Sequence, residues 1–402
     1  MKLRSISGAL LASAFISWLT IPSFSAEPPN IKANEILLGV PNVQSGPSGR
    51  SGKETLVGIR AMLDSVNADG GIHGKQLKIL SCDDKYEPTQ AVECFERLNS
   101  QGVFGLSGIF GSVCAIRYIQ AAMIDKMPVV GLSPGTTVIT DPPKRYVFAT
   151  RPSYHDEAAQ VVEKLWTEGG FRRFGLIYQG DAYGIDNMQG VKEALARHSA
   201  QITGVASYTR NQNTLSQMAK AVDDVKKSDP EVVILASVYK PCAEVAKISQ
   251  KLHWHPIFVI NSGSSPDLVV EEAGSLCEGW LFTEVVPPPS RSDLPLISRY
   301  QTAMRKFYPQ EKLGFTNLRG YVDALVWVEG LKRAGKEPTR EQFVAALEGI
   351  HDLDIGLGKG QELSYSKADH RGLHNVFFGT IKNGATTSFS DWKSLSHMSS
   401  AH

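Results

Sequence analysis

Short apolar runs rich in β-branched residues alternate along this chain with segments of helical periodicity, and the alternation restarts about halfway. In the first half, a run at 36–40 precedes a helix-like segment at 55–66 whose apolar residues recur every three or four positions. In the second half, a helix-like segment at 157–166 precedes a run at 174–178. Strands that alternate with helices pair in parallel, with helices covering both faces. The pattern predicts an α/β fold of two doubly wound, parallel-sheet lobes.

The remaining elements follow the same alternation. A proline-rich segment at 287–291 interrupts the second series, and a glycine-rich stretch at 355–360 predicts weak structure. Proline and glycine punctuation of this kind marks places where a chain crosses between lobes. Further strands are expected at 77–80, 104–106, 128–131, 205–208, 232–235 and 257–260, and further helices at 88–98, 187–196, 243–252, 293–308 and 316–334.

The charge balance excludes a basic surface for nucleic acid. The 402 residues hold 42 Lys and Arg against 41 Asp and Glu, for a net charge of +1.

The longest apolar stretch, at 6–18, follows Lys2 and Arg4 and precedes small residues at Ser23 and Ser25. This order is typical of a secretory signal, so residues 1–26 are predicted to be a signal peptide cleaved near Ser25 or Ala26. A buried N-terminal helix, the alternative, conflicts with Pro22.

The rest of the chain has no long apolar stretch, so we expect an exported protein that does not itself span the membrane.

Five cysteines are an odd number for an oxidising compartment, so at least one stays free or pairs between chains. A disulfide within the first lobe is possible because three of the five fall there. The cysteines are Cys82, Cys94, Cys114, Cys242 and Cys277.

Several short motifs suggest enzymatic chemistry. The segment 131–135 matches G-x-S-x-G, which would make Ser133 a hydrolase nucleophile. Pro134 argues against this role because a proline has no N–H to lend to an oxyanion hole. The glycine-rich segment 46–53 has the wrong spacing for a phosphate-binding loop, and Glu54 follows where Ser or Thr must reach magnesium.

Histidines and carboxylates also fail to form a site. His370 and His374 have helical spacing but a glycine between them and no third metal ligand nearby. The pair Asp83 and Asp84, at a strand end before Pro88, is typical of turn and cap chemistry. We therefore expect no enzyme activity, no cofactor and no metal.

A set of motifs spans nearly the whole chain after residue 26. They lie at 36–40, 45–47 with Gly52, 69–74, 83–84 with Pro88, 108–112, 133–137, 148–153 and 183–184. Together they resemble the Leu/Ile/Val-binding protein family, the periplasmic solute-binding proteins of type I fold that serve ABC importers.

The resemblance implies two lobes joined by a three-segment hinge, which closes on a ligand trapped between them. The first lobe would comprise 27–152 with 287–375, and the second 153–286 with 376–402. Open parallel sheets bind ligands beyond the carboxyl ends of their strands, which places the site at the same cleft.

The resemblance also implies a set of ligand-binding residues. Ser112 follows the strand near 104–108 and begins a helix, where its hydroxyl and nearby amides can hold a carboxylate. The carbonyl of Gly135, with Thr136 and the hydroxyl and amide of Thr137, would complete a polar clamp. From the second lobe, Tyr183 matches a tyrosine that packs over the solute.

At three further positions this sequence departs from the family pattern or matches it only with a shift in the alignment. Tyr239 matches a second ligand-packing tyrosine only with a one-residue slip, because Val238 competes for that place. Ser262 stands where amino-acid binders usually have an acidic partner for the α-ammonium, which weakens the case for a free amino acid. Ser51, beside Arg50, stands where an aromatic side chain commonly walls the pocket, so the pocket is expected to be wider or to accept a second anionic group.

These observations predict an extracytoplasmic, periplasmic component of an ABC importer that captures a small carboxylate-bearing solute. A branched-chain or other apolar amino acid and an aromatic or aliphatic carboxylic acid both fit, and the expected partners are that ligand and the membrane subunits of an ABC permease. A periplasmic sensor that presents its bound ligand to a membrane receptor is the alternative. A secreted serine hydrolase using Ser133 is more remote.

Overall fold

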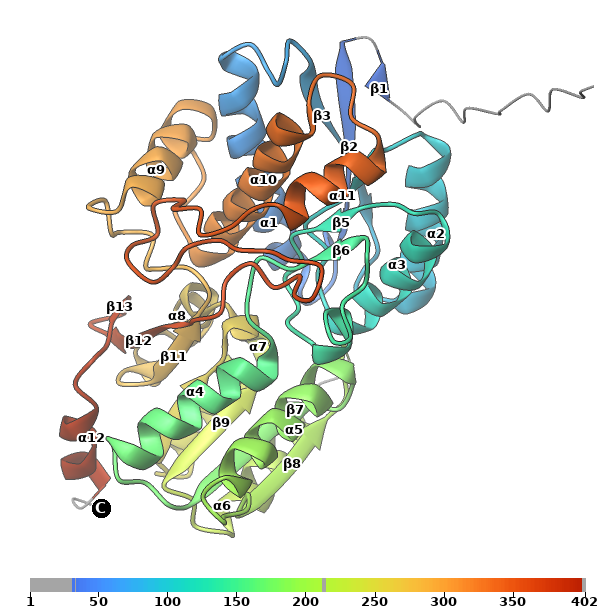
Figure 1. Cartoon of the computed structure of the whole chain (residues 1–402). Helices are drawn as coiled ribbons and strands as arrows, with labels where there is room; N and C mark the ends of the chain where they lie inside the picture. The colour runs from blue at the N-terminus through green and yellow to red at the C-terminus, as the bar shows by residue number, and fades with distance from the viewer. Residues whose placement is uncertain (1–30, 33, 212–214, 400–402) are drawn as a thin grey trace, which may run out of the picture.

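A computed structural model describes residues 31–32, 34–211 and 215–399 of the chain, and it has the two-lobed α/β architecture predicted above (Figure 1). Each lobe is built on its own sheet, and helices cover the sheets. The signal peptide predicted at 1–26 lies outside the described residues.

The first lobe, the upper one in Figure 1, has a sheet in the order β1-β2-β4-β5-β6, with β3 also paired to β2. All of these pairs are parallel except β1 with β2. In chain order its elements are β1 (Ile31–Lys32), β2 (Glu35–Asn42), α1 (Gly49–Ala68), β3 (Gln76–Asp83), α2 (Pro88–Ser100), β4 (Gly105–Leu106), α3 (Ser112–Ile124), β5 (Val129–Val130), the 3-10 turn Thr137–Ile139 and β6 (Val147–Phe148).

The second lobe has a sheet in the order β13-β12-β11-β10-β9-β7-β8, parallel from β11 to β8 and antiparallel at the β12 and β13 edge. Its elements are α4 (Tyr154–Thr167), β7 (Phe174–Gln179), α5 (Ala182–Ala196), β8 (Gly204–Tyr208), α6 (Leu215–Lys226), β9 (Val232–Ala236), α7 (Tyr239–Lys251), β10 (Ile257–Ile260), the 3-10 turn Ser262–Ser264, α8 (Pro266–Ala273), the 3-10 turn Gly274–Cys277, β11 (Leu281–Glu284), β12 (Phe377–Lys382), β13 (Ala385–Ser388) and α12 (Trp392–Ser399).

The chain crosses between the lobes three times: from β6 to α4, from β11 to α9, and from α11 back to β12. The second crossing returns α9 (Pro295–Phe307), α10 (Phe315–Ala334) and α11 (Arg340–Glu348) to the first lobe. There α10 packs directly against α1, and a Cβ at Gly58 would lie 1.7 Å from the carbonyl oxygen of Asn317. This close backbone approach fixes where α10 presents its side chains.

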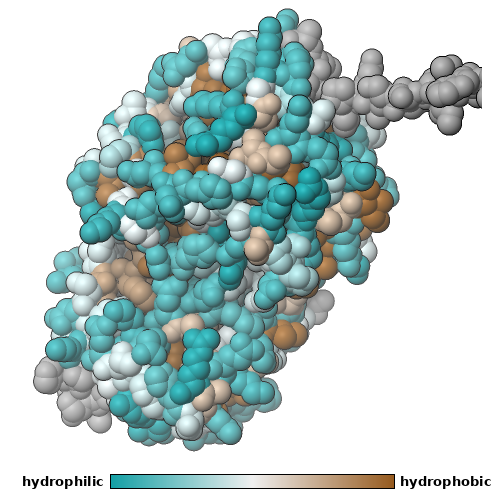
Figure 2. All heavy atoms as spheres, in the orientation of Figure 1, coloured by the Kyte–Doolittle hydropathy of each residue, from teal (hydrophilic) through white to brown (hydrophobic). Residues whose placement is uncertain are grey.

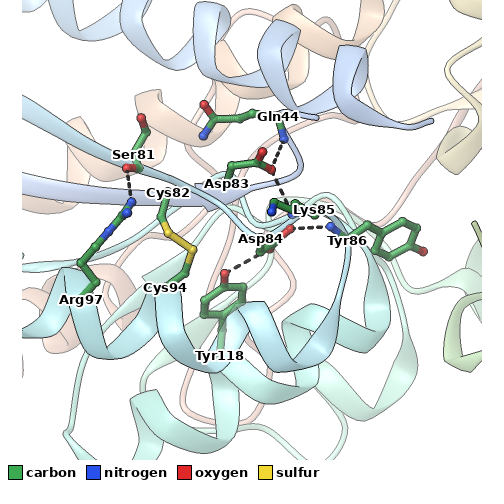
Figure 3. Close-up of a disulfide and its surroundings, with 10 residues drawn as sticks. All are labelled: Gln44, Ser81, Cys82, Asp83, Asp84, Lys85, Tyr86, Cys94, Arg97 and Tyr118. Atoms are coloured by element: carbon green, nitrogen blue, oxygen red, sulfur yellow. Dashed lines mark hydrogen bonds between the residues drawn. A yellow bond between two sulfur atoms is a disulfide. The ribbon is translucent and has the colours of Figure 1, made fainter. Parts of the chain in front are cut away.

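A disulfide joins Cys82, at the end of β3, to Cys94 on α2, with 5.7 Å between their Cα atoms (Figure 3). The bridge lies within the first lobe, as the cysteine distribution allowed. Cys114, Cys242 and Cys277 are buried free thiols.

The face of the molecule in Figure 2 is mainly hydrophilic, with small, scattered apolar patches. Within the described residues, no helix combines the length and the apolar content needed to cross a bilayer.

Candidate functional site: a cavity between the lobes

A cavity lies between the two lobes, beyond the carboxyl ends of strands from both sheets. In this closed arrangement its volume is about 20 Å³, so a solute of several carbon atoms enters only when the lobes separate. We call it the interlobe cavity. It is lined by Tyr86, Phe110, Gly111, Ser133 and Pro134 after strands of the first lobe, by Tyr154, Tyr183, Val238 and Gly263 from the second lobe, and by Arg319 from α10.

Ser112 is the first residue of α3, directly after the cavity-lining Gly111. Its side chain is fully buried, and its Oγ has no hydrogen-bond partner within the described residues. Gly111 has a φ of 76°, and a Cβ there would lie 1.9 Å from the ring of Tyr86, so only glycine permits this approach. A buried hydroxyl without a partner, beside the free amides of a helix N-terminus, is suited to hold an anionic group.

The loop after β3 holds Tyr86 in place through the two carboxylates at the strand end (Figure 3). Asp83 Oδ1 accepts hydrogen bonds from the amides of Gln44 and Lys85, at 2.8 and 2.9 Å. Asp84 accepts from the amide of Tyr86 at 2.9 Å and from the Tyr118 hydroxyl at 3.0 Å. Burial raises the pKa of Asp84 to about 6. Asp83 and Asp84 therefore stabilise the turn after β3, as the sequence indicated.

From the second lobe, Tyr183 stands near the start of α5 and turns its ring to the cavity. Its hydroxyl donates to Oδ1 of Asn261 at 2.6 Å, which fixes the ring orientation. Tyr154, at the start of α4, packs edge-on against it with 5.3 Å between ring centroids. Because the two rings support each other, this wall of the cavity is rigid and aromatic.

Ser262 does not line the cavity, because its amide and hydroxyl both donate to the buried carboxylate of Glu157, each at 2.8 Å. The hydroxyl of Thr283 and the guanidinium of Arg151 donate to the same carboxylate, with Arg151 Nη2 at 2.7 Å. A carboxylate thus lies beside the position where the sequence lacks one. Four donors already bind this carboxylate, so it has little remaining capacity to accept hydrogen bonds from an ammonium group.

Gly135, Thr136 and Thr137 lie together in the loop after β5 and contact the second lobe. The Gly135 carbonyl accepts from the amide of Tyr154 at 2.7 Å. The Thr136 hydroxyl donates to the carbonyl of Ala182 at 3.4 Å, and the Thr137 amide donates to Asp186 at 3.1 Å. In the closed arrangement these groups join the lobes, and their ligand-binding role stays a prediction.

Tyr239 and Ser51 lie outside the cavity lining. The Tyr239 hydroxyl donates to the carbonyl of Pro47 across the cleft at 2.8 Å, while its neighbour Val238 lines the cavity. Ser51 is buried within α1. Beside it, Arg50 forms an ion pair with Glu271 of the second lobe at 2.5 Å.

A second, smaller cavity of about 10 Å³ lies at the hinge, and Ser133 and Arg319 line both cavities. All three chain crossings contribute to it, through Arg151, Val285 and Leu373 among others. Arg319 therefore stands between the interlobe cavity and the hinge.

Two buried carboxyl groups lie near the hinge: Asp323 lines the hinge cavity, and Glu284 directly precedes the cavity-lining Val285. Burial raises the pKa of Asp323 to about 7, although the hydroxyl of Thr150 donates to it. Burial raises the pKa of Glu284 to about 8, against the opposing effect of Arg319 at 3.7 Å. Within the described residues, Glu284 Oε1 is buried without a hydrogen-bond partner, an environment that disfavours the charged carboxylate.

Glu284→Gln is expected to stabilise the protein more at pH 8 than at pH 5. The pKa of Glu284 is raised from 4.5 in the unfolded chain, so the wild type loses stability as pH rises from about 4.5 to 8, while a glutamine does not. The difference between the two pH values should be at least about 1.4 kcal/mol, the equivalent of one pKa unit. Urea unfolding at both pH values measures it, with exposed Glu311→Gln as control; an equal effect at both would contradict the assignment.

Sequence reasoning missed most of the cavity lining. Tyr86, Phe110 and Tyr154 each follow a strand end or begin a helix that was predicted, so the strand-end rule was the available signal. Arg319 had no such signal, because it lies in the interior of α10 and reaches the cleft only through the packing of α10 on α1.

Comparison with known proteins agrees with this architecture. The profile of a family described as periplasmic binding protein matches residues 35–386. A Leu/Ile/Val-binding protein homolog 7 from Brucella abortus is 24% identical over 334 residues, covering 78% of this chain and 80% of the relative. The fold and cleft define a two-lobed solute-binding protein, and the chain belongs to the periplasmic binding protein family.

Two solved structures are similar over nearly the whole chain. A possible leucine/isoleucine/valine-binding protein from Rhodopirellula baltica has a TM-score of 0.84 and 29% identity, covering 90% of this chain and 98% of that one. A fatty acid ABC transporter substrate-binding protein from Thermomonospora curvata has a TM-score of 0.81 and 22% identity, covering 92% and 96%. The resemblance to the Leu/Ile/Val-binding proteins is confirmed, and with it an extracytoplasmic class of protein.

Proposed function

We propose that this protein is the periplasmic solute-binding component of an ABC importer and captures a small carboxylate-bearing solute between its lobes. The observation that carries the proposal is the fully buried Ser112 Oγ, which has no partner within the described residues and lies beside the interlobe cavity. The leader at 1–26 would direct export, and the closed form would deliver the solute to the permease subunits.

The contacts of the cavity favour an acid without an α-ammonium. The carboxylate of Glu157, to which Ser262 donates, is also bound by Arg151. The Gly135 carbonyl is taken by Tyr154, and the cationic Arg319 lines the cavity. An ammonium group would lose its hydration here without gaining a free anion. The Thermomonospora protein, which has the same fold, is a fatty acid ABC transporter substrate-binding protein, and a fatty acid has no α-ammonium group.

Two other roles compete with import. A sensor would use the same cavity and closure, and permease and ATPase genes adjacent to this one would favour import over it. A serine hydrolase would need a base beside Ser133 and an N–H after it. Residue 134 is proline, and none of the ten described residues that line the interlobe cavity is a histidine. Labelling of Ser133 by a fluorophosphonate would favour the hydrolase.

Calorimetric titration with matched pairs tests the ligand class. Leucine is compared with 4-methylpentanoate, and phenylalanine with 3-phenylpropanoate. The acid of at least one pair should bind at least as tightly as its amino acid. If each amino acid binds a hundredfold tighter than its desamino analogue, the ammonium is required and the proposed class is wrong.

Ser112→Ala is expected to weaken binding of the acid that titrates by about ten- to a hundredfold, because it removes a hydrogen bond to a charged group. Ser249→Ala is the matched control, since the Ser249 Oγ is also buried without a partner in the described part of the chain but lies on α7 away from the interlobe cavity. Unchanged affinity in the Ser112 variant would remove Ser112 from the site.

A further inference from the structure

Among the described residues that line the interlobe cavity, Arg319 is the one with a cationic side chain. It projects from α10, which packs on the first lobe, yet it contacts the second lobe. Its Nη1 donates to the carbonyl of Ser262 at 2.5 Å, and its Nη2 donates to the hydroxyl of Ser265 at 3.0 Å. These bonds hold the guanidinium at the cavity.

One nitrogen of this guanidinium has no hydrogen-bond partner among the described residues. Arg319 is only 8% exposed, and its Nε–H is buried with no acceptor within the described residues. Leaving a buried donor of a charged group without a partner is costly, and Arg319 lines both the interlobe cavity and the hinge cavity, so an acceptor group on a bound solute would satisfy this donor.

The charge of Arg319 is also incompletely balanced. Its nearest carboxyl group, Glu284, lies 3.7 Å away, and burial raises the pKa of that group to about 8, which keeps it mainly neutral at pH 7. Burial also raises the pKa of Asp267. Another buried cation, Arg151, is by contrast paired with Glu157 at 2.7 Å.

We propose that Arg319 recognises a second acidic group on the solute, so that the preferred ligand is an aromatic acid carrying two carboxylates or a carboxylate and another acidic substituent. The proposal rests on the proposed function, in which Ser112 holds the first carboxylate. The unpartnered Nε–H of Arg319 can donate a charge-assisted hydrogen bond to this second acidic group.

The rings around the cavity argue for an aromatic body between the two acidic groups. Tyr86 and Phe110 approach from the first lobe and pack edge-on, with 5.2 Å between their centroids. Tyr154 and Tyr183 approach from the second lobe. Four rings on two sides of a closing cleft favour a flat, apolar body between them.

The test uses benzoate, the three benzenedicarboxylates and their monomethyl esters as titrants of the wild-type protein. At least one dicarboxylate should bind at least tenfold tighter than both benzoate and its own monomethyl ester, which has nearly the same shape but lacks the second charge. This comparison needs no variant. If no dicarboxylate gains over benzoate, the proposal is wrong.

Three variants then assign the gain to Arg319. Arg319→Gln should abolish the advantage of the dicarboxylate over benzoate, and Arg319→Lys should retain part of it. Arg299→Gln is the control, because Arg299 donates to the carbonyl of Ile355 away from the cavity and should leave the ratio unchanged. An Arg319→Gln variant that weakens benzoate and dicarboxylate equally would overturn the proposal.

The same measurements separate this proposal from the proposed function. If benzoate binds in a manner that depends on Ser112 but no dicarboxylate gains, only the role of Arg319 is wrong. If none of these acids, nor the acids of the matched pairs, binds to the wild type, both proposals are overturned.

Discussion

Replacing Glu157 with glutamine is expected to lower the free energy of unfolding by about 3–5 kcal/mol, the usual cost of breaking a buried ion pair. The Glu157 carboxylate accepts from Arg151, from the amide and hydroxyl of Ser262, and from Thr283. A glutamine offers one acceptor oxygen, and its amide donors would face these donors. Both side chains of the pair are 1% exposed, so water provides no replacement.

Urea unfolding followed by circular dichroism measures this loss. Glu163→Gln on the same helix is the matched control, since its side chain is 58% exposed and its change should stay within about 0.5 kcal/mol. The double variant Arg151→Met/Glu157→Gln should lose less than the sum of the single variants, because neither charge is then left alone. A loss below about 1 kcal/mol for Glu157→Gln would mean that the pair is not buried in solution.

Removing the disulfide is expected to cost about 3 kcal/mol of unfolding free energy. Cys82 and Cys94 are 12 residues apart, and closing a loop of this length restricts the unfolded chain by that amount. The closed loop also contains Asp83, Asp84 and Tyr86, so the bridge supports the segment that places Tyr86 at the interlobe cavity.

The experiment compares the wild type with Cys82→Ala/Cys94→Ala, each with and without dithiothreitol. The reductant should destabilise the wild type and leave the variant unchanged, because the variant retains only the buried thiols Cys114, Cys242 and Cys277. Equal effects of reductant on both proteins would show that the stabilisation does not come from this bridge.

Much of the fold could be predicted because apolar residues recur with a regular period along its long helices and strands. The helix expected at 316–334 is α10 (Phe315–Ala334), and the strand expected at 257–260 is β10 (Ile257–Ile260). The sequence did not predict β6, which has only two residues, or β13, whose sequence is Ala-Thr-Thr-Ser. Neither has an apolar run long enough to show a period, and both are held by their neighbours in a sheet.

The site was harder to predict because tertiary contacts decide which side chains face the cavity. Ser112 lies directly after cavity-lining Gly111, and Tyr183 lines the cavity itself, since strand and helix ends fix both places. Ser262 turns to Glu157, a contact across 105 residues that no local pattern encodes. Val238 rather than Tyr239 lines the cavity, although the resemblance left that choice open.

The exposed ion pairs between the lobes make closure sensitive to the ionic strength of the surrounding medium. Arg50 with Glu271 and Arg210 with Glu87 each join one lobe to the other, and all four side chains are partly exposed. Dissolved salt screens such exposed pairs strongly, whereas it reaches the buried pair of Arg151 and Glu157 far less. Rising ionic strength should therefore favour the open, ligand-free form while leaving the internal structure of each lobe unchanged.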